Sequence, residues 1–360
     1  MNRDRCRAAG LYEADPPAIL AQKENAMFKK VGRVRWLLTQ VLIVGSALLL
    51  LTIAQAQEAA APVKPDTAPE VKSHLDAAKK LAGTEWIPAI NFFCVAPRAN
   101  ASDDPLLEPV KIFDNVYAVG RTETTVYAIT TSDGIILIDS GYPNQTESII
   151  VPGLVKLGLD PAKVKLVIVT HGHGDHGGGS AYFQEKYGSK VALSEADWDF
   201  MLPKPGEAPK GKANNPLPKR DVIAVEGQPL TLGDEKVTPV LTPGHTPGSM
   251  ALIFTVKDNG RTHIAGLYGG TILLPGRPPK ETMDQYLASA EHYAEFAKKM
   301  KVDVELQNHP LMDGMADKLG KLRGRKPGDP NPFIVGEAGY GRYTGVMIEC
   351  FKAQMARRGM

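Results

Sequence analysis

The sequence predicts an α/β protein with two strand-rich halves and helices between and after the strands. Short β-branched runs recur through residues 110–306 and are typical of buried strands. Apolar residues follow helical periodicity over 147–157, 180–187, 283–300 and 336–355. Histidines directly follow three of the predicted strands. Side chains that can bind a metal are therefore expected where strands end.

Composition places the chain among ordinary soluble globular proteins. Its 360 residues are 43% hydrophobic and 23% charged, and this length is enough to bury a large core. The formal net charge of +2 argues against a dedicated nucleic-acid surface. We therefore expect a small-molecule substrate and no nucleic-acid partner. The sequence indicates no particular oligomeric state.

The N-terminal region, 1–56, is predicted to be an extension followed by a secretory signal peptide. Basic residues precede an apolar run over 36–54, and Ala54-Gln55-Ala56 then supplies a small-residue cleavage site. We expect periplasmic export, cleavage after Ala56 and no stable membrane association afterwards. An uncleaved anchor is the alternative, because the run is long enough to span a bilayer. Acidic residues dilute the basic region before Met27, so Met27 is the expected start.

Three further segments are expected after the signal peptide. Residues 57–85 are predicted to be a linker, because their first part is rich in Ala and Pro. Residues 86–325 form the main domain, and 326–360 form a C-terminal helical extension. Cys94 and Cys350 can pair in an oxidising compartment or remain two buried free thiols. Nothing in the sequence places them near each other.

The first predicted strands cover 110–113, 116–119, 125–130 and 135–138. The last of them ends at Asp139, and a carboxylate at the end of an apolar strand is costly to bury without a partner. We interpret Asp139 as an acceptor that orients a metal-binding histidine. A simple turn aspartate is the alternative.

The next strand, 163–170, leads into the most informative stretch of the chain. It is followed at once by His171, His173, Asp175 and His176, separated by glycines. Imidazole and carboxylate ligands suit zinc. One tetrahedral ion that keeps an open position cannot use four of them, so the stretch predicts two neighbouring metal ions. A solvated polar loop is the alternative.

Two more histidines occupy the same kind of position. His245 follows a predicted strand over 237–241, and His309 follows one over 302–306. Both are therefore candidate ligands, whereas His74, His263 and His292 lack this setting and are expected to be structural. Further strands are predicted at 191–193, 221–225, 230–232, 250–256 and 263–267. The Pro- and Lys-rich loop 203–218 is expected to be a lid or disordered.

These motifs together resemble the metallo-β-lactamase superfamily, most closely the third subclass of metallo-β-lactamases. The resemblance rests on His-x-His-x-Asp-His at 171–176, Pro-Gly-His-Thr-Pro-Gly at 243–248 and the strand-terminal His309-Pro310, and it covers roughly 110–310. It implies a four-layer α/β/β/α sandwich. It also implies two zinc ions, the first bound by His171, His173 and His245 and the second by Asp175, His176 and His309.

The resemblance implies an exported hydrolase that opens a β-lactam ring by attack of a zinc-bound hydroxide, with Asp175 handling a proton as well as ligating. A lactonase or thioesterase of the same fold is one alternative, and a non-catalytic zinc-binding protein is another. Those hydrolases usually carry a bridging Asp on the strand before the last long helix, and 265–271 has none. Thr271 is in register with the serine that helps hold the substrate carboxylate in the third subclass, so it is a weak substrate-binding candidate. The Gly269-Gly270 pair beside it departs from that subclass.

Overall fold

The computed structural model describes residues 63–360 except for 96–103, 203, 205–206, 208–215 and 274–277. The predicted signal peptide and most of the predicted lid lie outside the described residues. Within the described part of the chain, none of the helices has the length and apolar character that a membrane span requires.

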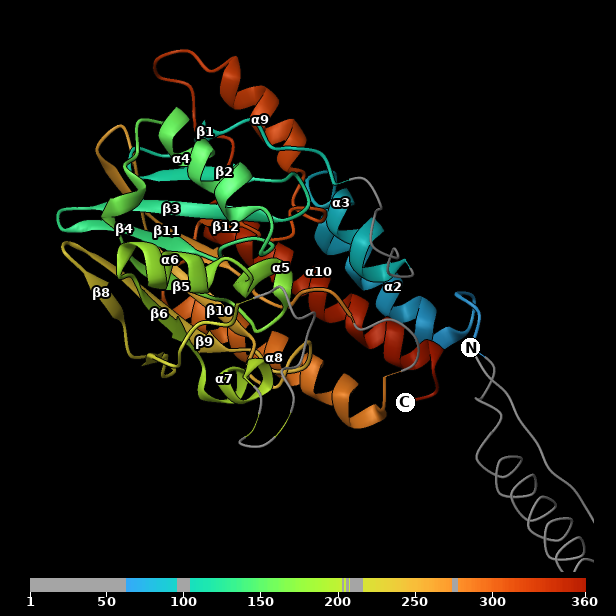
Figure 1. The fold of residues 1–360 in the computed structure, drawn as a ribbon. Helices are drawn as coiled ribbons and strands as arrows, with labels where there is room; N and C mark the ends of the chain where they lie inside the picture. Colours follow the sequence, from blue (N-terminus) through green and yellow to red (C-terminus); the bar gives the residue numbers. More distant parts are fainter. Residues whose placement is uncertain (1–62, 96–103, 203, 205–206, 208–215, 274–277) are drawn as a thin grey trace, which may run out of the picture. The chain divides into compact units, whose positions relative to one another are not determined.

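Two sheets form the centre of the fold (Figure 1). The first has seven strands in the order β1 to β7, and the second has five in the order β12-β11-β10-β9-β8. The strands of the first sheet are β1 (Val110–Lys111), β2 (Val116–Gly120), β3 (Thr125–Thr131), β4 (Gly134–Ile138), β5 (Val164–Ile168), β6 (Lys190–Leu193) and β7 (Val222–Ile223). Those of the second are β8 (Leu230–Leu232), β9 (Glu235–Leu241), β10 (Met250–Asp258), β11 (Arg261–Leu267) and β12 (Val304–Leu306).

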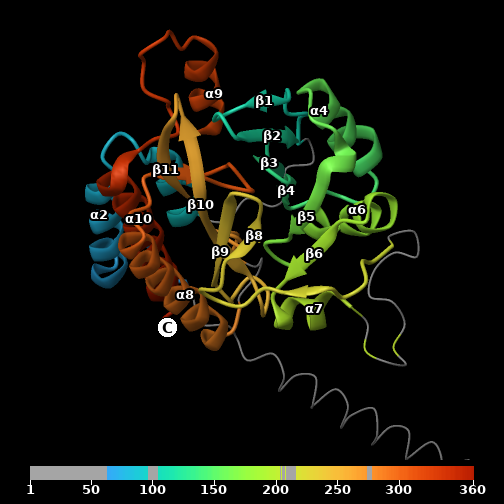
Figure 2. The ribbon, with the colours of Figure 1, turned by 90° about the vertical axis from the view of Figure 1, so that its left-hand side faces the viewer.

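Helices cover the outer face of each sheet (Figure 2). The first sheet is covered by η2 (Thr146–Ile150), α4 (Val151–Lys156), α6 (Ser180–Tyr187) and α7 (Glu195–Met201). The second is covered by α2 (Pro69–Ala82), η1 (Ile90–Cys94), α8 (Lys280–Lys299) and α10 (Gly336–Arg357). The remaining short helices are α3 (Ile87–Ala89), η3 (Pro161–Lys163), α5 (Gly174–Gly177) and α9 (Met315–Arg323).

Three apolar clusters fill the spaces between these layers. Between the sheets, side chains such as Ile138 and Ile168 pack with Leu252 and Leu267. A second cluster joins the first sheet to its helices, and a third joins the other sheet to α2, α8 and α10. Burial of these alternating strand faces drives the packing. The predicted four-layer α/β/β/α sandwich is confirmed.

The strands that precede the candidate ligands end at one edge of the sandwich. In the first sheet β4 and β5 are parallel. In the second, β9 and β11 both pair antiparallel with β10, and β12 is parallel to β11, so β9 and β12 run in the same direction. The Met250 amide at the start of β10 donates to the Thr170 carbonyl just after β5, 2.9 Å away, which joins the two sheets at this edge.

The predicted linker over 57–85 is wrong for its second half. Residues 69–82 form helix α2, whose buried side chains Val71, Leu75 and Ala78 belong to the core next to the second sheet. Pro at the first turn favours a helix start, but the Ala- and Pro-rich composition before it hid the apolar spacing that follows. The final helix was predicted correctly, and it packs into this same core rather than extending from it.

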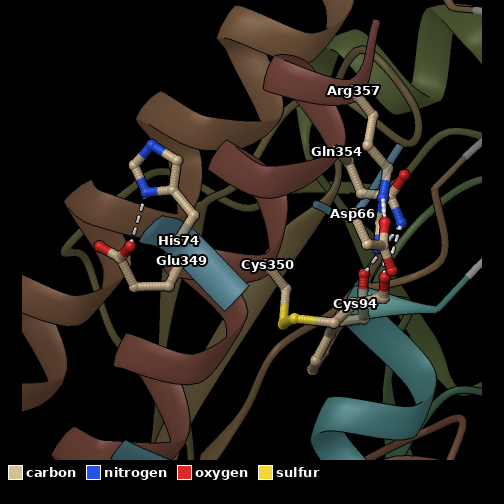
Figure 3. The surroundings of a disulfide bond; sticks show 8 residues. Asp66, His74, Cys94, Glu349, Cys350, Gln354 and Arg357 are labelled. Carbon is tan, nitrogen blue, oxygen red and sulfur yellow. Dashed lines mark hydrogen bonds and ion pairs between the residues drawn. A yellow bond between two sulfur atoms is a disulfide. The ribbon is translucent and has the colours of Figure 1, made fainter. Parts of the chain in front are cut away.

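A disulfide between Cys94 and Cys350 ties η1 to α10 (Figure 3). Both cysteines are buried, and their Cα atoms lie 4.6 Å apart. The Cys94 carbonyl also accepts a hydrogen bond from the Arg357 guanidinium at 2.5 Å. The structure thus decides the question that the sequence left open, in favour of pairing.

Candidate metal centre

Six side chains from three segments meet at the edge where β5, β9 and β12 end. They form two groups of three whose potential ligand atoms all lie within 4.8 Å of one another in each group: His171, His173 and His245; and Asp175, His176 and His309. Within the described residues, these are the two groups that could hold a metal ion. They are the groups that the resemblance implied.

The first triad consists of three imidazoles. His173 Nδ1 lies 3.0 Å from His245 Nε2, and the ring centres of His171 and His245 are 4.7 Å apart. His171 is fully buried, and its Nε2 has no hydrogen-bond partner. A buried polar atom without a partner is costly, so it indicates a bound group that the protein atoms do not supply.

The second triad combines two imidazoles with a carboxylate. His176 Nε2 lies 2.8 Å from His309 Nε2 and 3.3 Å from Asp175 Oδ2, and His309 Nε2 lies 3.5 Å from that same oxygen. Ligands of a tetrahedral zinc ion are about 3.3 Å apart when the metal-ligand bonds are about 2.0–2.1 Å. The donor spacing and donor chemistry of both triads therefore fit such an ion.

The outer ring nitrogens are held by acceptors, which leaves the inner nitrogens free to ligate. His245 Nδ1 lies 2.7 Å from the Ile272 carbonyl oxygen, and His309 Nδ1 lies 2.6 Å from that of Glu123. His171 Nδ1 lies 3.1 Å from the Thr170 hydroxyl. A hydrogen bond at one ring nitrogen fixes the tautomer and directs the lone pair of the other.

Asp139 contacts the second triad directly and the first triad through Thr170. Its Oδ2 lies 2.7 Å from His176 Nδ1, which is the contact predicted for it. Its Oδ1 accepts from the Thr170 amide at 2.7 Å, and Asn308 Nδ2 donates to its Oδ2 at 3.1 Å. Asp139 has a φ of 62°, a left-handed conformation that costs energy for a residue with a side chain. Its hydrogen bonds hold that conformation in place.

Burial lowers the pKa values of the histidines in the two triads, and only for His176 is the net shift upward. It lowers the pKa of His171 and His173, and with neighbouring imidazoles it lowers that of His245 to about 3. The pKa of His309 falls to about 4 for the same reasons. These rings are neutral at pH 7, the form that binds a metal. Burial acts the same way on His176, but the carboxylates of Asp175 and Asp139 outweigh it and raise its pKa to about 10.

Comparison with known proteins identifies the fold family. The model of the metallo-β-lactamase superfamily matches residues 119–261. The solved structure of BJP-1, a subclass B3 metallo-β-lactamase of Bradyrhizobium japonicum, is 34% identical and covers 71% of this chain and 96% of its own, with a TM-score of 0.59. The chain belongs to the metallo-β-lactamase superfamily.

Curated relatives in the superfamily are matched over shorter stretches. The probable metallo-hydrolase YflN of Bacillus subtilis is 29% identical over 146 residues, which are 36% of this chain and 54% of the relative. The acyl-coenzyme A thioesterase MBLAC2 of Gallus gallus is 27% identical over 181 residues, which are 44% of this chain and 60% of the relative. The chain thus spans a little over half the length of these relatives.

Thr271 is the weak substrate-binding candidate. Its side chain is fully buried, and its hydroxyl has no hydrogen-bond partner. It follows directly on Gly270, where the chain turns with a φ of +77°. Its contact with a substrate stays a prediction.

The remaining histidines lie outside the two triads. His74 pairs with Glu349, His263 with Asp303 and His292 with Glu226, each through a ring nitrogen at 2.6–3.1 Å from a carboxylate oxygen. Each therefore has a structural partner of its own, as predicted.

Two residues that contact the metal-centre loops, Asn308 and Asp197, were not among those predicted from the sequence. Asn308 donates to both the Asp139 carboxylate and the Thr170 hydroxyl, at 3.1 and 2.9 Å. Its place next to His309 was the one available hint. Asp197 on α7 contacts the loops of the first triad and is distant in sequence from every ligand.

Proposed function

We propose that this chain is an exported, zinc-dependent hydrolase that opens the β-lactam ring and binds two zinc ions per chain. The observation that carries the proposal is the pair of triads, with three imidazoles in one and a carboxylate and two imidazoles in the other. The ligands proposed for the first ion are His171, His173 and His245, and those for the second are Asp175, His176 and His309. The likeness to BJP-1 over nearly all of that enzyme supports the β-lactam assignment.

Bound zinc supplies a Lewis acid and lowers the pKa of water to about 7, so hydroxide is available at neutral pH. The chain's own residues hold the reacting groups and move protons. Burial would raise the pKa of Asp175, but the neighbouring His176 lowers it well below its usual range, so the carboxylate is ionised. Asp175 is the one carboxylate in the two triads, and it is the residue proposed to accept a proton and return it to the leaving nitrogen.

The stretch where related lactonases and thioesterases carry a bridging Asp has no room for one. A Cβ atom on Gly269 would lie 2.2 Å from the Met250 carbonyl oxygen and 2.8 Å from Thr170 Cβ. A Cβ atom on Gly270 would lie 2.8 Å from Ser249 Oγ and 3.0 Å from His245 Cβ. The two ions are therefore proposed to be held without a bridging carboxylate, which favours a lactamase of the third subclass.

A thioesterase is the second candidate, and the match to an acyl-coenzyme A thioesterase favours it. A fold does not fix the substrate, and the metal centre would serve either hydrolysis. A lactonase of the same fold is the further variant of this alternative.

Kinetics on a substrate panel test the proposal. Zinc-loaded protein would be assayed against a carbapenem, a cephalosporin, an acyl-homoserine lactone, a glutathione thioester and an acyl-coenzyme A thioester. We expect β-lactams to be hydrolysed, EDTA to abolish the activity and zinc to restore it. Inhibitors that trap a serine should have no effect. A kcat/KM below about 10² M⁻¹s⁻¹ for both β-lactams, against a usual range of about 10⁴–10⁸ M⁻¹s⁻¹, would favour the second candidate.

A further inference from the structure

We propose that Asp197 is a positioning residue that locks together the two loops of the first triad and thereby sets the affinity of that site for its ion. The proposal rests on the proposed function, because it presumes that the triad binds a metal. Asp197 lies in the first turns of α7 and is fully buried. It belongs to neither triad and contacts no ligating atom.

One carboxylate oxygen of Asp197 holds the first ligand loop. Its Oδ2 accepts a hydrogen bond from the Gly172 amide at 2.7 Å. Gly172 separates His171 from His173, so the orientation of its peptide sets the direction of both imidazoles. A charge-assisted bond to a buried backbone amide is among the stronger hydrogen bonds in a protein.

The same carboxylate holds the second ligand loop. Its Oδ2 accepts from the Thr246 hydroxyl at 2.6 Å, and its Oδ1 accepts from the Gly248 amide at 2.7 Å. Thr246 directly follows His245. All three ligands of the first triad are therefore within one residue of a direct hydrogen-bond donor to Asp197, although 48 positions separate Asp197 from His245 in the sequence.

Close packing leaves the loops little freedom to move relative to α7. A Cβ atom on Gly248 would lie 2.1 Å from Ser194 Oγ and 2.5 Å from the Asp197 amide nitrogen. A Cβ atom on Gly172 would lie 3.0 Å from Phe200 Cδ1. Both loops thus pack closely against the same helix, and the Asp197 carboxylate fixes their positions on it.

At position 197 an aspartate carboxylate can accept more hydrogen bonds than an asparagine amide of the same shape. Three donors point at Asp197, and an amide nitrogen cannot accept from any of them. The three hydrogen bonds that Asp197 accepts all come from the two ligand loops. Asp197→Asn should therefore lose at least one loop contact while keeping the side-chain volume.

Two single-site backgrounds make the test specific. Asp175→Ala leaves the first triad as the complete site, and His171→Ala leaves the second. Asp197→Asn would be added to each, and the zinc dissociation constant would be measured by competition with a chromophoric chelator. Asp199→Asn is the matched control, because Asp199 is an exposed carboxylate on the same helix and pairs with Arg220. Cobalt absorption spectra of each protein would report ligand geometry independently of activity.

We expect Asp197→Asn to raise the zinc dissociation constant of the first triad about 10- to 100-fold, as loss of a supporting contact to a metal ligand typically does. The second triad should change by a smaller factor, because the donors to Asp197 adjoin none of its ligands. Asp199→Asn should change neither site. An unchanged first triad, or an equal loss at both sites, would overturn the proposal.

A second variant covers the case in which Asp197→Asn does not fold. Thr246→Val keeps the side-chain shape and removes one of the three donors, so it should weaken the first triad alone and by a smaller factor. If it leaves that triad unchanged, the proposal is wrong. Failure of the parent backgrounds to bind zinc would instead refute the proposed function, which keeps the two conclusions separate.

Discussion

His176 Nδ1, on α5, lies 2.7 Å from Oδ2 of Asp139, which directly follows β4, and both side chains are buried. The contact orients the ring so that its other nitrogen faces Asp175 and His309. The second triad therefore depends on a carboxylate that does not belong to it.

Asp139→Asn should weaken the second metal site more than the first. The amide keeps the side-chain shape but removes the negative charge that holds the His176 ring. Asp139 contacts the first triad only indirectly, through Thr170. We expect the zinc dissociation constant of the second site to rise about 10- to 100-fold. Asp133→Asn, at the exposed turn before β4, is the matched control. A chelator competition series measures both, and equal affinity in wild type and Asp139→Asn would contradict this role.

Asp175→Ala or His309→Ala should leave roughly one zinc ion per chain and reduce hydrolysis about 10-fold or more. Each change removes one of three ligands from the second triad and leaves the three imidazoles of the first intact. Elemental analysis after dialysis gives the stoichiometry. His292→Ala, an exposed histidine paired with Glu226, should keep the wild-type value. Two tightly held zinc ions in either ligand variant would refute the assignment.

The contribution of Asp313 to the free energy of unfolding should grow as the pH falls below about 7. Burial raises the pKa of Asp313 to about 7; Lys318 opposes the rise and Glu305 adds to it. Because the folded state holds this proton more tightly than the unfolded chain, stability from Asp313 is greatest at low pH and is lost as the pH rises through about 7.

Chemical unfolding of wild type and an Asp313 variant at several pH values tests this prediction. Asp313→Asn should flatten the pH dependence of the free energy of unfolding relative to wild type. Asp317→Asn, an exposed carboxylate on α9, should leave it unchanged. A pH dependence that is identical in wild type and Asp313→Asn would show that Asp313 does not titrate there.

Loss of the Cys94–Cys350 disulfide should destabilise the folded protein by about 2–5 kcal/mol, because the bond closes a long loop in the unfolded chain. Cys94→Ser and Cys350→Ser would be compared with the double variant by denaturant unfolding. If the bond forms in solution, the double variant loses no more stability than a single one. Additive losses would mean that the thiols act separately.

The exported protein should begin at Gln57. The basic residues, the apolar run over 36–54 and Ala54-Gln55-Ala56 predict cleavage after Ala56. Intact-mass analysis of protein from the periplasmic fraction measures the mature N-terminus. A mature chain that keeps the apolar run would instead indicate a membrane anchor.

The sequence by itself predicted the strand pattern, four of the helical segments and the six candidate ligands. These features are local: alternation and helical spacing record which face is buried, and His171 to His176 are separated by fixed short distances. His245 and His309 could be predicted because each follows a strand in the same way. The grouping into two triads needed the family resemblance.

Only the tertiary structure decided which distant residues meet. It brought Cys94 to Cys350 across a separation of 256 residues, placed α2 in the core and joined Asp197 to both loops of the first triad. A buried carboxylate or a free cysteine has no periodicity of its own. Its partner is chosen by how the layers pack, and that packing arises from contacts between residues that are far apart in the chain.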